Sequence, residues 1–182
     1  MEKINILVLI GGICQESLNK RLFSEIQKNY NGSLSFSNFE IEKLPYYSQD
    51  IESSGLPVVE EFKNAIKNAQ GILLITPEYN RSFSGVLKNA LDWGSRPWGQ
   101  SLWNKKPVGI IGTTIGALGT YGAQDQLKTV CGFLNMPIMN HPEFYGNAAQ
   151  LLDENGLKAD AVPFVQNYFD EFEKWVKFNA KL

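Results

Sequence analysis

The sequence predicts an α/β protein built around a parallel β-sheet. Short apolar runs alternate along the chain with segments that have the apolar spacing of amphipathic helices, and this alternation is typical of βαβ units. The apolar runs contain few polar residues, as expected of strands that helices cover on both faces. We therefore expect five strands and five helices in strict alternation, in a single domain that spans residues 1–182.

The strands are expected where short, mostly apolar runs occur. The first, Ile4–Ile10, is apolar except at Asn5. The second, Leu34–Phe39, has a looser pattern, which favours a position nearer an edge of the sheet. The remaining three are expected at Gly71–Thr76, at Pro107–Thr113 and, as a short strand, near Ile138–Met139.

The helices are expected where apolar residues recur three and four positions apart. In the first, for example, Leu18, Leu22 and Ile26 share one face. Pro57 suits the first position of the second helix, and Asp160 suits the N-cap of the last. The polar stretch Pro45–Leu56 is expected to be a loop. The five helices are expected at about Ser17–Lys28, Pro57–Ala69, Gly85–Trp93 and Thr120–Leu134, and from Asp160 to about Val176.

The composition excludes several classes of protein. A hydrophobic content of 43% in 182 residues is typical of a folded domain and not of a disordered chain. With 17 Lys+Arg against 19 Asp+Glu, the chain lacks the basic field of a nucleic-acid-binding protein. No apolar run is long enough to span a bilayer, so we expect no membrane partner. Because Cys14 and Cys131 lie far apart and outside any zinc-binding spacing, we expect no disulfide, no metal site and a cytoplasmic location.

Ligands of open parallel sheets bind outside the carboxyl ends of the strands, so the loops after the first, third and fourth strands are the candidate sites. The first loop, Gly11–Asn19, has two glycines that permit a tight turn, followed by polar residues at a helix start. Free N–H groups at a helix start favour an anion. Two interpretations remain equally open, a phosphate cradle and an ordinary N-cap at Ser17. The loop matches neither the dinucleotide fingerprint nor the P-loop.

The loop after the third strand is more specific. Pro77 directly follows a buried strand, which stops strand pairing and turns the backbone outward. Tyr79 and Asn80 then offer a ring face, a phenol and an amide, which suit a planar heteroaromatic ligand. The third loop, Thr113–Gly119, contains two glycines that let the backbone approach the same ligand closely.

Three stretches of the sequence match one known family. The strongest match is Thr76–Trp93, with its Pro-Glu-Tyr-Asn core and its Gly-Val-Leu-Lys-Asn-Ala helix, and it continues into Ser95-Arg96-Pro97. The stretches Lys106–Gly119 and Asn140–Phe144 match as well. On these residues the chain resembles the NADPH-dependent FMN reductase family of the flavodoxin-like fold, which includes quinone, chromate and azo-dye reductases. The resemblance covers roughly residues 4–145 and implies a five-stranded parallel sheet in the order 2-1-3-4-5 with helices on both faces.

The resemblance implies an oxidoreductase that uses FMN and either NADPH or NADH. In the family, NAD(P)H passes a hydride to non-covalently bound FMN, which then reduces a flavin, a quinone or a similar small electron acceptor in a ping-pong cycle. The cofactor carries the chemistry, so no catalytic acid, base or nucleophile is assigned. Members assemble as homodimers or homotetramers in which the neighbouring subunit closes the flavin site. Carried over by position, the residues implied to bind FMN are Gly12, Cys14, Ser17, Leu18 and Asn19 on the phosphate side, and Pro77, Glu78, Tyr79, Asn80, Thr114 and Gly116 around the ring.

The first loop departs from the family pattern Gly-Ser-x-Arg-x-x-Ser-x-Asn. Gly12 replaces the serine and Cys14 replaces the arginine. A charge-assisted contact from arginine to phosphate contributes about 1.5–3 kcal/mol, so its loss is expected to weaken FMN binding. Glu16 adds repulsion, and Lys20 or Arg21 are candidates to compensate. This departure keeps a second hypothesis open, a non-catalytic flavin- or nucleotide-binding protein that acts as an electron carrier or sensor.

Two further features bear on assembly. Gly122 stands where other members place an arginine of a tetramer contact, which favours a dimer over a tetramer. Trp93, Trp98 and Trp103 lie around a Gly/Pro-rich stretch after the third helix, and we expect them to meet a second subunit rather than to line the substrate mouth. A structural or surface role is expected for His141.

Overall fold

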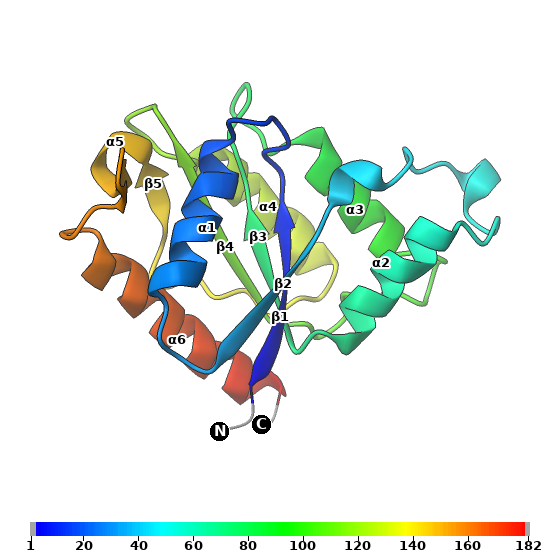
Figure 1. Ribbon diagram of the computed structural model, residues 1–182. Helices are drawn as coiled ribbons and strands as arrows, with labels where there is room; N and C mark the ends of the chain where they lie inside the picture. The colour runs from blue at the N-terminus through cyan, green and yellow to red at the C-terminus, as the bar shows by residue number, and fades with distance from the viewer. Residues whose placement is uncertain (1–2, 181–182) are drawn as a thin grey trace.

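The protein is described here by a computed structural model that covers residues 3–180 (Figure 1). Its main sheet has five parallel strands in the order β2-β1-β3-β4-β5, which confirms the order implied by the family resemblance. The strands are β1 (Ile4–Ile10), β2 (Leu34–Phe39), β3 (Gly71–Ile75), β4 (Val108–Thr114) and β5 (Tyr145–Asn147).

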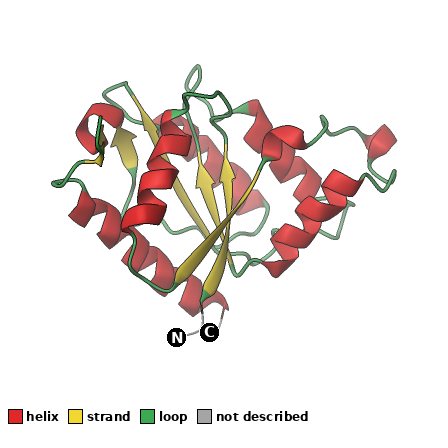
Figure 2. Ribbon diagram, in the orientation of Figure 1, coloured by secondary structure: helices red, strands yellow, loops and turns green. Residues whose placement is uncertain are grey.

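Helices cover both faces of the sheet, as Figure 2 shows. One face packs against α1 (Leu18–Asn29) and α6 (Val162–Ala180). The other packs against α2 (Pro57–Asn68), α3 (Gly85–Gly94) and α4 (Tyr121–Phe133). Alternate residues of β1 enter the two cores, because successive side chains of a strand point to opposite faces. All of β3 is buried, which confirms the prediction that the apolar runs are covered on both sides.

The fifth strand lies later in the chain than predicted. Ile138 forms only an isolated bridge to Val108, and the strand that completes the sheet is Tyr145–Asn147. Pro137 and Pro142 flank the predicted run, and proline has no N–H to extend a ladder of strand hydrogen bonds. Elements that the sequence did not predict are the short helices η1 (Ile41–Lys43), η2 (Gln49–Ile51) and α5 (Ala148–Leu151) and the antiparallel pair β6 (Leu152–Asp153) and β7 (Gly156–Leu157).

The last helix begins later than predicted, but its apolar stripe is confirmed. It starts at Val162, so Asp160 lies two residues before the first helical position and is not its N-cap. Val165, Phe169, Phe172 and Val176 of the expected stripe are buried against the sheet, and Val162 is half-buried. Among residues 3–180, no helix combines the length and the apolar character needed to cross a membrane.

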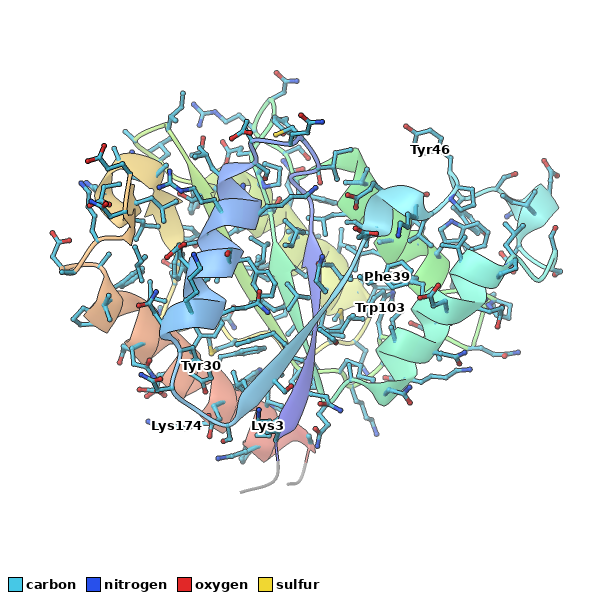
Figure 3. The ribbon with its side chains drawn as sticks, viewed as in Figure 1. Lys3, Tyr30, Phe39, Tyr46, Trp103 and Lys174 are labelled. Carbon is cyan, nitrogen blue, oxygen red and sulfur yellow. The ribbon has the colours of Figure 1, made fainter. Side chains whose placement is uncertain are left out.

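Two of the three tryptophans expected at a subunit contact belong to the core. Trp93 and Trp103 are fully buried, and each indole N–H donates to a backbone carbonyl, of Pro45 and Leu91 respectively, at 2.8 Å. A satisfied indole N–H removes the main cost of burying tryptophan. Trp103 lies between the sheet and α2 (Figure 3). Of the three, only Trp98 is exposed, at 78%.

Candidate functional site

Three loops meet at the carboxyl edge of the sheet, at the top of Figure 1. They comprise residues 11–17 after β1, residues 76–84 after β3 and residues 115–120 after β4. The first two are in direct contact, because a Cβ on Gly11 would overlap the side chain of Ser84. The first two loops therefore form a continuous surface at the edge where strand order predicts a site.

The first loop has the form of an anion cradle. The Ser17 hydroxyl oxygen caps α1 by accepting a hydrogen bond from the backbone N–H of Lys20 at 3.3 Å. Within residues 3–180, no backbone N–H of residues 12–19 donates to a protein acceptor. A Cβ on Gly12 would overlap the Ser17 hydroxyl, so a glycine allows the loop to close this tightly. The sequence left open whether this loop is a phosphate cradle or an ordinary N-cap at Ser17. The two are compatible, because the cap leaves the backbone N–H groups of residues 12–19 free for an anion.

The residues implied to bind the cofactor differ in exposure. Those whose surface is buried are Gly12, Ser17, Asn19 and Pro77. Those half-buried are Leu18, Glu78 and Thr114, and those exposed are Cys14, Tyr79, Asn80 and Gly116.

The side chain of Asn19 joins the first loop to the third. Its Nδ2 donates to the Thr113 carbonyl at 3.1 Å, and its Oδ1 accepts from the Thr113 N–H at 2.9 Å. Both groups are buried. The amide of Asn19 is therefore committed to β4, and only its backbone N–H remains for a ligand in the first loop.

Only one of the two candidate cations reaches the first loop. The ammonium group of Lys20 donates to the Ile13 carbonyl at 3.2 Å and lies 3.3 Å from a carboxylate oxygen of Glu42. Arg21 instead donates to the Asp153 carbonyl, at the far side of α1. Of the two, Lys20 is therefore the cation that lies beside the first loop.

The loop after β3 contains a two-residue hairpin. Tyr79 and Ser82 exchange backbone hydrogen bonds of 2.9 Å each. The central residues Asn80 and Arg81 have φ of 51° and 65°, the left-handed region used at both central positions of a type I′ turn. We call residues Tyr79–Ser82 the ring hairpin. Its first residue, Tyr79, is 55% exposed and open to a ligand.

The ring hairpin is held from behind by α4. A Glu78 carboxylate oxygen accepts from the backbone N–H of Ala123, near the start of α4, at 3.1 Å, and the other lies 3.2 Å from Arg81. The Gln126 amide donates to the Arg81 carbonyl at 2.8 Å and accepts from the Ser82 hydroxyl at 2.7 Å. Gln126 was not predicted from the sequence, because no local pattern connects it to a turn 45 residues earlier.

The third loop is shaped by a glycine and an asparagine. Gly119 has φ of 59°, and a Cβ there would lie 2.6 Å from the backbone of Tyr145. The Asn147 amide donates to the carbonyls of Gly116 at 3.2 Å and Ile115 at 3.4 Å. Asn147 was also missed, although an asparagine before a short helix is an N-cap signal that would have identified it.

Two buried hydroxyl groups at this edge have no protein partner. Ser84 and Thr113 each carry a buried side-chain oxygen that makes no hydrogen bond within the described part of the chain. Buried polar groups without a partner are rare, and at a site they fit a polar ligand. The three loops together offer neutral donors, one aromatic face and small residues, which suit a phosphate and a planar ring. Within the described chain, no three His, Cys, Asp or Glu side chains cluster as metal ligands do.

Comparisons with known proteins agree on one family. The family model described as NADPH-dependent FMN reductase matches residues 4–150. A 2-hydroxy-1,4-benzoquinone reductase from Burkholderia sp is 44% identical over 177 residues, which covers 96% of this chain and 97% of that protein. A quinone reductase from Pseudomonas putida is 39% identical over 178 residues and covers 96% of both. The solved structure of FerB, a flavoenzyme NAD(P)H:(acceptor) oxidoreductase from Paracoccus denitrificans, has a TM-score of 0.91 at 34% identity, covering 97% of this chain and 98% of that one.

Proposed function

Because the chain belongs to the NADPH-dependent FMN reductase family, we propose that it is an NAD(P)H:quinone reductase that holds FMN at the carboxyl edge of the sheet. When bound, FMN supplies the redox chemistry: it takes a hydride from NAD(P)H and delivers two electrons to a quinone, which gains two protons to become the hydroquinone. The observation that carries this proposal is the match to reductases along almost the whole chain, at 44% and 39% identity. The same observation favours an enzyme over the alternative of a non-catalytic carrier or sensor.

On the phosphate side, the proposed contacts are mainly backbone N–H groups. The unpaired donors of residues 12–19 surround the start of α1, where the helix dipole also favours an anion. Ser17 can donate its hydroxyl hydrogen, because its cap uses only a lone pair. Cys14, Leu18 and Asn19 take part through their backbone.

Around the ring, the proposed role of the loop residues is to orient the flavin. The exposed phenol face of Tyr79 and the amide of Asn80 lie on the ring hairpin, and Pro77 precedes it. Thr114 and Gly116 lie on the third loop, which borders the other edge. Because this edge of the sheet is exposed, water supplies the one proton that the hydroquinone needs beyond the hydride, and no residue needs to act as acid or base.

We also propose that the protein is a homodimer whose contact lies in a groove between α3 and α4. A hollow of about 720 Å³ includes Trp98 and Phe133, each 78% exposed. It shares Lys88, Thr129 and Val130 with a second hollow of about 430 Å³ that reaches Ser82 of the ring hairpin. A second copy in this groove would cover the two aromatic side chains and would lie beside the flavin site.

A cytoplasmic location remains a prediction that rests on the cysteines. Both are free thiols: Cys14 is exposed, and Cys131 is buried. Burial raises the pKa of the Cys131 thiol to about 12, which keeps it protonated and unreactive. A reducing compartment suits a chain with these two unpaired thiols.

Steady-state kinetics test the proposed activity. NADPH or NADH oxidation is followed at 340 nm with 1,4-benzoquinone as acceptor, before and after the protein is loaded with FMN. We expect turnover that depends on FMN and parallel double-reciprocal lines, the pattern of a ping-pong cycle. Tight FMN binding without oxidation of either nucleotide would instead support the carrier.

A further inference from the structure

We propose that the first two turns of α4 form a positioning surface that sets the place of the ring hairpin, with Gln126 as the positioning residue and Gly122 as the point of closest approach. This inference rests on the proposed function, because the hairpin is the segment assigned to the flavin ring. It adds residues of α4 that touch neither FMN nor substrate in that assignment.

The ring hairpin needs support from outside. Its two central residues, Asn80 and Arg81, are not glycines but have positive φ, a conformation that disfavours an L side chain, arginine more than asparagine. A two-residue hairpin with a single pair of backbone hydrogen bonds is not stable by itself. Its conformation therefore depends on the contacts that surround it.

Gln126 supplies a two-point contact of defined geometry. Its amide nitrogen donates to the Arg81 carbonyl at 2.8 Å, and its amide oxygen accepts from the Ser82 hydroxyl at 2.7 Å. One planar amide thus holds two consecutive residues of the hairpin. Because both bonds come from one planar amide, they fix the orientation of the hairpin at a short distance from α4.

Gly122 sets that distance. A Cβ at this position would lie 3.1 Å from the Arg81 carbonyl oxygen and 3.3 Å from a carboxylate oxygen of Glu78. Such contacts are tighter than most real Cβ contacts, so an alanine would push the hairpin outward by a few tenths of an ångström. The buried Glu78 carboxylate, bound to the Ala123 N–H, adds a third link between the two segments.

The test uses two variants with matched controls. Gly122→Ala is compared with Gly132→Ala in the same helix, where a Cβ would meet nothing within 4 Å. Gln126→Ala is compared with Gln166→Ala, a half-buried glutamine of α6 whose side chain donates to Asp170 one turn away. Each purified variant is measured for FMN and riboflavin affinity by flavin fluorescence, for visible circular dichroism of the bound flavin, and for melting temperature without flavin.

We expect Gly122→Ala and Gln126→Ala to weaken FMN and riboflavin equally, by about tenfold, because the hairpin contacts the ring that both share. The visible dichroism of their bound flavin should change, and neither control should alter affinity or dichroism. Gln126→Glu, which still accepts from Ser82 but has no amide to donate to Arg81, should lie between wild type and alanine.

Two results would overturn the positioning role. One is that Gly122→Ala and Gln126→Ala match their controls in affinity and dichroism. The other is that they lower only the melting temperature, which indicates a purely structural contact. Failure of the wild-type protein to bind either flavin would instead reject the proposed function, so the two failures are distinguishable.

Discussion

Asn19 and Thr113 are 94 residues apart in the sequence and are joined by two buried hydrogen bonds between one side-chain amide and one backbone unit. The bonds run in opposite directions, so both the N–H and the carbonyl of Thr113 are satisfied by the same amide. The start of α1 and the end of β4 are thereby fixed to each other, and with them the first and third loops of the site.

Asn19→Ala should destabilise the protein strongly. The substitution removes two buried hydrogen bonds and leaves the Thr113 N–H and carbonyl without partners, a loss of about 2–4 kcal/mol in free energy of unfolding. Urea unfolding measures it, with Asn29→Ala as the control because Asn29 bonds only within its own helix, to Glu25. Equal small losses for both variants would show that the amide of Asn19 does not join the two loops.

Lys20→Gln should weaken FMN but not riboflavin. Lys20 is the cation that reaches the first loop, and riboflavin lacks the phosphate that its charge would attract. Because its side chain is 38% exposed, solvent screens the interaction, and we expect about a threefold to fivefold loss that shrinks at high salt. Fluorescence titration of both ligands measures the ratio, and Lys28→Gln on the same helix is the control. A ratio of FMN to riboflavin affinity that Lys20→Gln leaves unchanged would contradict this role.

Glu173 should stabilise the protein in a pH-dependent way. Partial burial raises the pKa of its carboxyl, but hydrogen bonds from Lys177 and Ser33 oppose this, and so does the bond from Tyr30. The net result lowers the pKa to about 2 from an ordinary value of 4.5. Since the folded pKa lies below the unfolded one, the stabilisation is present above pH 4.5 and is lost as the pH falls toward 2.

Unfolding by urea at several pH values between 7 and 3 tests whether this stabilisation is lost as the pH falls. Glu173→Gln should be less stable than wild type at pH 7, and the difference should shrink below pH 4.5. Glu171→Gln is the control, because that carboxylate is paired only with Lys174 at the surface. A difference for Glu173→Gln that stays constant over this range would refute the linkage.

Phe133→Asp should dissociate the proposed dimer. Phe133 lies in the groove between α3 and α4 and is 78% exposed, and a carboxylate there would be desolvated in a contact. Phe178→Asp is a matched control, because Phe178 is 79% exposed on α6, outside the groove. Sedimentation velocity should show a dimer for wild type and Phe178→Asp, and a monomer for Phe133→Asp. A wild-type monomer would reject the dimer.

Most of the fold could be predicted because its signals are local. The period-two and period-3.6 apolar patterns identify four of the five strands of the main sheet and the long helices. Strand β5, with the sequence Tyr-Gly-Asn, lacks such a signal, and it forms because residues 112–114 of β4 pair with it.

The burial of Trp93 and Trp103 was missed for a related reason. The sequence around them is rich in Gly and Pro, as surface loops often are. The backbone carbonyls that accept from their indole N–H groups are brought near by the fold and cannot be recognised from the sequence.

The site could be predicted to the level of its loops but not of its supports. Strand order alone brings the three loops together, and the Pro-Glu-Tyr-Asn motif marks the second. The partners of Asn19 and Gln126 lie far away in the sequence, so no spacing reveals them. The structure also changes the interpretation of Glu78, whose carboxylate is engaged with the start of α4 and not free to face a ligand.

One anaerobic titration decides whether this chain carries electrons from NAD(P)H through bound FMN to a quinone. The FMN-loaded protein is titrated with NADPH, or with NADH, while absorbance at 450 nm is recorded, and 1,4-benzoquinone is then added. We predict that one equivalent of nucleotide per flavin bleaches the band and that one equivalent of quinone restores it. A band that neither nucleotide bleaches, or that bleaches but does not return with quinone, would show that the protein is not an NAD(P)H:quinone reductase.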